Sequence, residues 1–311
     1  MRKVLLALLL SASSLASAAV LSIEFNFTPY VGDPVKNDHV VTVPGKATVF
    51  VNNMPVAEQE IQKNTVPVLF DDREIGTAVW IPASSMGPAL RRGKNTIRIE
   101  FVPTDAKAHY DAQLRWASVT DQVTRTEKGP GQVSSTNQSD QGADTRKGLG
   151  KAVLEREFAA DFAADLPWHH FPAVTALADA DRQELAAMVS ARAATFKPDF
   201  SAVYQLLKNG NSSGIELNLE GIQKTRILHK AYAAGVRITA PRADQLDFVL
   251  TGNPEVVVRS KTGRLFAADP KAIGRIKGDE LQMGLGMVLG VLYPPQFVAV
   301  RDASGKWAVA Y

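Results

Sequence analysis

Two adjacent histidines in the second half of the chain are the residues best suited to chemistry. His169 and His170 lie in the segment Leu166–Pro172, shortly after Asp161 and Asp165. Imidazole beside carboxylate can act as a general acid and base or bind a metal ion. Adjacent side chains on an extended segment point in opposite directions, so one metal ion would rarely take both histidines. The four residues are therefore candidates for acid–base catalysis, and the alternative is a packed turn with half-exposed imidazoles.

Three further patterns favour structural roles. The glycines of Gly284–Gly290 are spaced one residue too far apart for a dinucleotide-binding loop and follow no strand, so they favour close packing of a helix. Asp71 and Asp72 could bind calcium at a sheet edge, but we expect a solvated turn. His229 lies among basic residues in an expected helix and is interpreted as a surface or core-edge residue. The sequence thus predicts no metal site and no cofactor.

The first eighteen residues have the layout of a secretory signal peptide. Arg2 and Lys3 precede the apolar run Val4–Leu10, and a segment of small residues ends at Ala18. A basic start, a short apolar middle and a small-x-small exit predict cleavage after Ala18. The apolar run is shorter than the about 20 residues that a membrane-spanning helix needs. We therefore expect a periplasmic or secreted protein with no transmembrane segment after removal of this bacterial-type signal.

Composition excludes several classes of chemistry. The chain has 311 residues and no cysteine, which removes disulfides, thiol nucleophiles and thiolate metal sites. Loss of residues 1–18 removes Arg2 and Lys3 and lowers the formal net charge from +3 to +1. A chain this close to neutral, without a basic stripe that contains aromatic residues, is not expected to bind nucleic acid. Ser212 lies in a Gly-x-Ser-x-Gly segment, Gly210–Gly214, but the segment follows an expected helix, whereas the turn of a serine nucleophile follows a strand.

The hydrophobic pattern divides the chain into parts of different character. Residues 19–120 alternate apolar and polar positions between turns rich in glycine, proline and asparagine, as in Thr96–Val102. This period of two predicts an antiparallel β-sandwich, jelly-roll-like, with Trp80 and Trp116 in its core. Residues 121–150 are polar and nearly free of large apolar side chains, which predicts a flexible linker. Residues 151–311 combine helical periodicity with late hairpins and predict a separate α+β domain.

Helix signals in the second half place five helices. The first would run from Ala152 to Ala164, so that the carboxylates of Glu157, Asp161 and Asp165 fall near one face. Asp181 and Glu184 have the spacing of a capping box and open the second. The others are expected at residues 198–209, 219–234 and 280–292.

Two turn segments resemble a known family of accessory domains. Ala47–Asn53, and later Leu90-Arg-Arg-Gly-Lys-Asn-Thr-Ile97, are similar to turns of galactose-binding-like jelly rolls, which accompany many carbohydrate-active enzymes. The family shows a strand that ends in Val-Phe-Val-Asn-Gly and a Leu-x-x-Gly-x-Asn-x-Ile turn; this chain has Asn53 where the family often has glycine. The likeness covers about fifty residues of scaffold, so it implies a fold and no sugar specificity. The second domain resembles no family that we recognise.

Two classes of function fit these observations. The first is an exported, non-catalytic binding or envelope-associated protein with a protein or glycan partner, which agrees with the lack of cysteine and the neutral charge. The second is a periplasmic hydrolase of a glycan or peptide that uses His169 or His170 with Asp165 or Asp161. Exposed aromatic residues on one sheet face would favour glycan binding, whereas a cleft lined by the histidines would favour the hydrolase.

Overall fold

The computed structural model describes residues 19–32, 40–68, 71–75, 77–129, 132–209, 217–302 and 304–310. The predicted signal peptide and its cleavage site after Ala18 lie outside these residues. None of the helices in the described part of the chain combines the length and apolar character needed to span a bilayer. The fold consists mostly of antiparallel sheets, with helices gathered in the second half of the chain.

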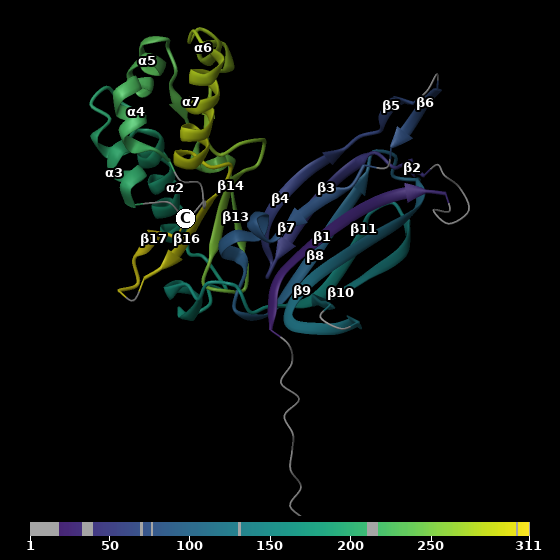
Figure 1. Cartoon of the computed structure of the whole chain (residues 1–311). Coiled ribbons are helices and arrows are strands. Elements are labelled where there is room, and N and C mark those ends of the chain that lie inside the picture. Colours follow the sequence, from purple (N-terminus) through teal and green to yellow (C-terminus); the bar gives the residue numbers. More distant parts are fainter. Residues whose placement is uncertain are drawn as a thin grey trace, which may run out of the picture.

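Two antiparallel sheets form the first half of the fold (Figure 1). In sheet A the strand order is β10-β9-β1-β2, and β7 also pairs with β1; in sheet B the order is β11-β8-β3-β4. The sheet A strands are β1 (Val20–Val31), β2 (Val41–Thr42), β7 (Val79–Pro82), β9 (His109–Gly129) and β10 (Gln132–Leu149). The sheet B strands are β3 (Gly45–Val51), β4 (Met54–Ile61), β8 (Gly93–Pro103) and β11 (Ala152–Ala160). A separate hairpin joins β5 (Asn64–Val68) to β6 (Asp71–Ile75).

The alternation seen in the sequence determines which side chains are buried. Phe25 and Phe27 of β1 and Leu114 of β9 point from sheet A into a core that they share with Ile97 and Ile99 of sheet B. The intervening polar residues of these strands face outward, because successive strand side chains point to opposite faces. The predicted single buried face per sheet is confirmed for these strands.

The predicted flexible linker at residues 121–150 is wrong. Residues 121–129 form the end of β9 and residues 132–149 form β10, and the two strands pair from Leu149 with His109 to Gln132 with Gly129. Their polar composition suggested disorder because it offers little apolar surface to bury. In the fold, cross-strand backbone hydrogen bonds between β9 and β10 order the segment, and β1 pairs with β9 as far as Thr120, so an edge strand needs few apolar side chains.

The predicted helix at Ala152–Ala164 is also wrong. Residues 152–160 form β11, which pairs with β8 from Ala152 opposite Phe101 to Ala160 opposite Gly93. Ala152, Leu154 and Phe158 are buried and their neighbours are more exposed, so the segment has the period of a strand. The helical spacing of its acidic residues was misleading, because strand pairing with β8 decides the conformation. Sheet B therefore extends to Ala160, beyond the expected boundary at residue 120.

The second half of the chain contains helices and a four-stranded sheet, β13-β14-β16-β17, which we call sheet E. The helices pack against one face of this sheet. The helices expected at 198–209 and 280–292 are confirmed as α3 and α7, whereas the one expected at 219–234 is broken at Arg226 into α4 and α5. Asp181 lies inside α2 rather than at its start, and its carboxylate accepts a hydrogen bond from the backbone N–H of Ala178. The helices are α1 (Ala83–Met86), α2 (Asp179–Ala193), α3 (Ser201–Asn209), α4 (Leu219–Thr225), α5 (Ile227–Ala233), α6 (Pro270–Gly274) and α7 (Asp279–Leu292). The strands are β12 (Ile238–Thr239), β13 (Leu246–Leu250), β14 (Val256–Ser260), β15 (Ala267–Ala268), β16 (Phe297–Arg301) and β17 (Trp307–Val309), and short 3-10 turns lie at Gly87–Ala89, Pro167–His170 and Ala243–Gln245.

Sheet E lies between the helices and the long strands of the first half (Figure 1). Val256 and Val258 of β14 belong to the core formed with the helices. Val257, between them, and its cross-strand partner Val298 belong instead to the core of sheets A and B. Adjacent strand residues thus contribute to two different cores, which joins them through one sheet.

Polar contacts reinforce this junction. The Nη2 atom of Arg91 lies 2.9 and 2.8 Å from the two carboxylate oxygens of Glu255, a residue that is only 1 % exposed. Asn53 donates from its amide to the carbonyl of Thr251, and Asn253 donates to the carbonyl of Asn52. The turn at Asn52 and Asn53 therefore contacts the second half of the chain.

Candidate functional site

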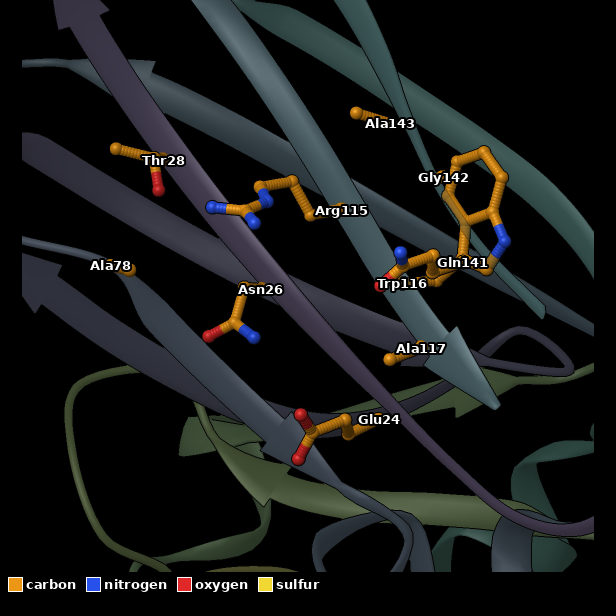
Figure 2. Close-up of a pocket in the computed structure, with 10 residues that line it drawn as sticks. All are labelled: Glu24, Asn26, Thr28, Ala78, Arg115, Trp116, Ala117, Gln141, Gly142 and Ala143. Carbon is orange, nitrogen blue, oxygen red and sulfur yellow. The ribbon is translucent and has the colours of Figure 1, made fainter. Parts of the chain in front are cut away.

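A hollow of about 780 Å³ lies on the outer face of sheet A (Figure 2). Strands β1, β9 and β10 form most of it, and the residue before β7 completes one side. Its lining residues are Glu24, Asn26, Thr28, Ala78, Arg115, Trp116, Ala117, Gln141, Gly142 and Ala143. A concave surface of this size lies within the range of small-ligand sites, about 300–1,000 Å³.

The strand register aligns the side chains of this hollow in rows, together with Trp80, which lies beside the hollow. Trp80 of β7 lies directly opposite Asn26 of β1, which lies opposite Arg115 of β9, which lies opposite Ala143 of β10. The next row places Glu24 opposite Ala117, with Gln141 beyond. Because neighbouring strands lie about 4.8 Å apart, Trp80 and Arg115 are separated by roughly 10 Å across the sheet.

Trp80 is the most unusual residue of this face, because its side chain is 60 % exposed. Its indole N–H donates a hydrogen bond of 3.0 Å to Glu24, which holds the ring beside the hollow. The prediction that Trp80 belongs to the core is wrong. Val79 and Ile81 are buried on either side of it, so strict alternation already directed the indole outward.

Trp116 lies on the opposite face from Arg115, and its ring is partly buried against the core of sheets A and B rather than enclosed in it. The guanidinium of Arg156 covers the ring at 3.2 Å from its centroid. Gly142 of β10 lies against the same ring, and a β-carbon there would come within 2.2 Å of it. Figure 2 shows the indole beside Gly142. The absence of a side chain at Gly142 therefore lets β10 close over Trp116.

Two polar side chains face the hollow with their hydrogen-bonding capacity unused. Among the described residues, neither the amide of Asn26 nor the guanidinium of Arg115 has a hydrogen-bond or ion-pair partner. In Figure 2 Arg115 extends from β9 toward β1, near Asn26 and Thr28. Small residues surround them, since Ala78, Ala117 and Ala143 leave room above the sheet. The arrangement can accept a polar ligand without rearrangement of existing contacts.

The histidine pair lies elsewhere, in the 3-10 turn Pro167–His170 rather than on an extended segment. His170 meets Asp165 at 2.8 Å between Nε2 and Oδ1, with the two side chains 69 % and 56 % exposed. The Nε2 atom of His169 lies instead 3.2 Å from the carbonyl of Pro88, and its own carbonyl accepts a hydrogen bond from Arg91. His170 therefore pairs with Asp165, whereas His169 contacts residues at the junction of the two cores.

The environment of His169 alters its protonation. Partial burial lowers the pKa of its imidazole below the ordinary value, and the nearby Arg91 acts in the same direction. The contact with the Pro88 carbonyl and the carboxylates of Glu255 and Asp165 oppose this shift. A neutral His169 therefore belongs to the folded state, where it packs edge-on against Trp168.

Asp161, the remaining catalytic candidate, accepts a hydrogen bond of 2.7 Å from the backbone N–H of Val20 and so anchors the start of β1. Asp71 and Asp72, the candidate calcium ligands, lie in β6, for which only the backbone is described. His229 of α5 packs edge-on against Phe200 at 4.8 Å between ring centroids. No group of three possible metal-binding side chains occurs within the described ranges.

A second hollow, of about 450 Å³, lies between α4, α5 and α7. Its walls include Ile222, Ile227 and Val288, and Gly284 contributes to it from α7. The close packing expected at Gly286 and Gly290 is wrong, because outside the nearby backbone of α7 no described atom lies within 4 Å of a β-carbon added at either glycine. Neither glycine lines this hollow. The histidines line neither hollow.

Comparison of the chain with protein families, with curated proteins and with solved structures finds no match. The function is therefore inferred from the geometry of the site.

Proposed function

We propose that this protein is an exported, non-catalytic binding protein that holds a glycan on the outer face of sheet A. In this proposal the first half is a jelly-roll-like β-sandwich module and the second an α+β module that associates with the cell envelope. The observation that carries the proposal is the exposed indole of Trp80 beside a row of polar side chains. The leader-like residues 1–18 support a periplasmic or secreted location.

The chemistry of the hollow suits a sugar. An aromatic ring offers a large flat apolar surface on which the C–H face of a sugar ring can stack. Hydroxyl groups both donate and accept, so they can pair with the Asn26 and Gln141 amides and the Glu24 carboxylate. A flat stacking surface flanked by mixed donors and acceptors favours a glycan over an apolar ligand, which would leave Asn26 and Arg115 unpaired.

A periplasmic hydrolase remains the second candidate because His170 and Asp165 form a close acid–base pair. Their high exposure counts against it, since a catalytic pair gains from a site that excludes water. The pair also lies outside both hollows, which leaves it without a described cavity to hold substrate.

A glycan array tests the proposal. The protein purified after expression of the full chain should bind a subset of glycans, and Trp80→Ala should abolish that binding without loss of the folded state. Phe162→Ala is the matched control, because it removes an exposed aromatic ring that, unlike Trp80, has no described hydrogen bond to a residue of the hollow. Equal glycan binding by both variants would contradict the proposed surface. Release of shortened glycans that stops in His170→Ala would establish the hydrolase instead.

A further inference from the structure

Arg115 is the positively charged residue of the sheet A hollow, and Glu24 is the negatively charged one. The two are diagonal rather than direct neighbours, because Arg115 pairs with Asn26 and Glu24 pairs with Ala117. Glu24 is already bound by the indole N–H of Trp80. Its carboxylate makes no ion pair with Arg115 among the described residues.

Arg115 differs in this respect from other arginines of the fold. Four other strand arginines have carboxylate partners: Arg98 has Glu100, Arg156 has Asp144, Arg259 has Asp247 and Arg301 has Asp181. A fifth, Arg146 of β10, donates to the carbonyl of Val153. Arg115 is exposed within a hollow and has no described partner at all. Its guanidinium therefore presents its full set of donors to whatever occupies the hollow.

We infer that the glycan bound by sheet A carries an anionic group, a carboxylate or a sulfate, that pairs with Arg115; this inference rests on the proposed function. The planar guanidinium matches the two oxygens of such a group, and hydrogen bonds between opposite charges are about twice as strong as neutral ones. Asn26, directly opposite, can donate to the same group. An uncharged glycan would use only part of this capacity.

The charges of the hollow also orient the ligand. Glu24 would repel an anion, so the anionic group lies on the Thr28 side of Arg115, toward which the guanidinium extends in Figure 2. Further along the sheet, Asp111 lies opposite Lys147, so that row has no net charge. The separation of roughly 10 Å between Trp80 and Arg115 exceeds a single sugar ring. The stacked ring and the charged sugar therefore belong to different units of one chain.

Binding of two polymer pairs tests the inference. The first pair is polygalacturonate and the same polymer with its carboxyl groups reduced to alcohols; the second is dextran sulfate and dextran. Calorimetry on the purified protein should show at least one charged polymer bound about tenfold or more tightly than its neutral partner. The affinity should fall as salt is raised, since screening weakens the pairing. The pair that shows the larger difference identifies the anionic group.

Variants separate recognition by Arg115 from general charge attraction. Arg115→Gln should lose the preference for the charged polymer, whereas Arg264→Gln, which removes an exposed charge outside the hollow, should keep it. Equal losses in both variants, or no binding of either charged polymer, would overturn the inference. Tight binding of a neutral polymer that requires Trp80 but not Arg115 would also overturn it and would leave the proposed glycan surface intact. Thermal melting of Arg115→Gln should match the parent protein.

Discussion

Removal of Arg91 is the sharpest test of how the two cores are joined. Glu255 is 1 % exposed, and both of its carboxylate oxygens accept hydrogen bonds from Arg91, whose side chain is 22 % exposed. Arg91→Ala leaves a buried carboxylate without its cation. Loss of one partner of a buried ion pair costs about 3–5 kcal/mol of unfolding free energy. A typical domain has only about 5–15 kcal/mol in total, so the variant should be severely destabilised.

Replacement of both partners provides the matched comparison. Arg91→Met with Glu255→Met removes the charges together, and its cost should be smaller than that of Arg91→Ala because no buried charge is left unpaired. Lys94→Ala is the control for a surface pair, since Lys94 and Glu157 are 72 % and 66 % exposed. Exposed pairs contribute about 0–1 kcal/mol.

Urea unfolding followed by circular dichroism and by tryptophan fluorescence measures these effects. The parent protein should unfold in one transition by both probes, because sheet E contributes Val257 to one core and Val258 to the other. A loss in Arg91→Ala no larger than in Lys94→Ala would refute the reasoning that Glu255 is a buried, paired charge. Two separate transitions in the parent protein would refute the shared sheet.

Three further predictions concern single positions. Gly142→Ala should lower the free energy of unfolding by the cost of overpacking against Trp116, about 1–3 kcal/mol, and so lower the thermal midpoint, whereas Ala143→Ser, on the outer face, should not. Arg226→Gly should raise the midpoint, because Arg226 has a φ of 53°, a left-handed conformation that costs about 1 kcal/mol for a residue with a side chain. Folding stability should fall as the pH drops below about 6.5, since burial lowers the pKa of folded His169 and the unfolded chain then binds the proton more readily. His169→Gln should reduce this dependence in urea titrations between pH 7 and 5, and an unchanged slope would contradict the assignment.

Local patterns were sufficient where one residue type determines the outcome. The alternation of Thr96–Val102 identified the buried face of β8, and the i, i+3, i+4, i+7 spacing from Phe200 to Leu207 marked the apolar face that α3 buries. The turn at Asn95 was also readable. Its buried amide binds the backbone of Arg91 and Gly93 and the amide of Asn52, which joins the turn at Asn52 to the turn before β8.

Local patterns failed where a distant partner decides the conformation. The helical spacing of Glu157, Asp161 and Asp165 favoured a helix over the strand period of Ala152–Ala160. The pairing of this segment with β8, which the sequence does not show, makes it a strand. The candidate catalytic residues do not form one cluster, for the same reason. Asp161 binds the start of β1, and His169 contacts the loop around Pro88. Only His170 and Asp165, five residues apart, came together as expected.

The sequence by itself determined which face of each regular strand is apolar, which residue types are available for chemistry and where several helices run, because these properties depend on neighbours a few positions away. The tertiary structure alone decided that Trp80, Asn26 and Arg115 share one row, since these residues come from β7, β1 and β9. It also decided that residues 132–149 are a strand, because the backbone hydrogen bonds that order them come from β9. The order and register of strands depend on contacts between distant segments, and a single sequence reveals the period of a strand but not its partner.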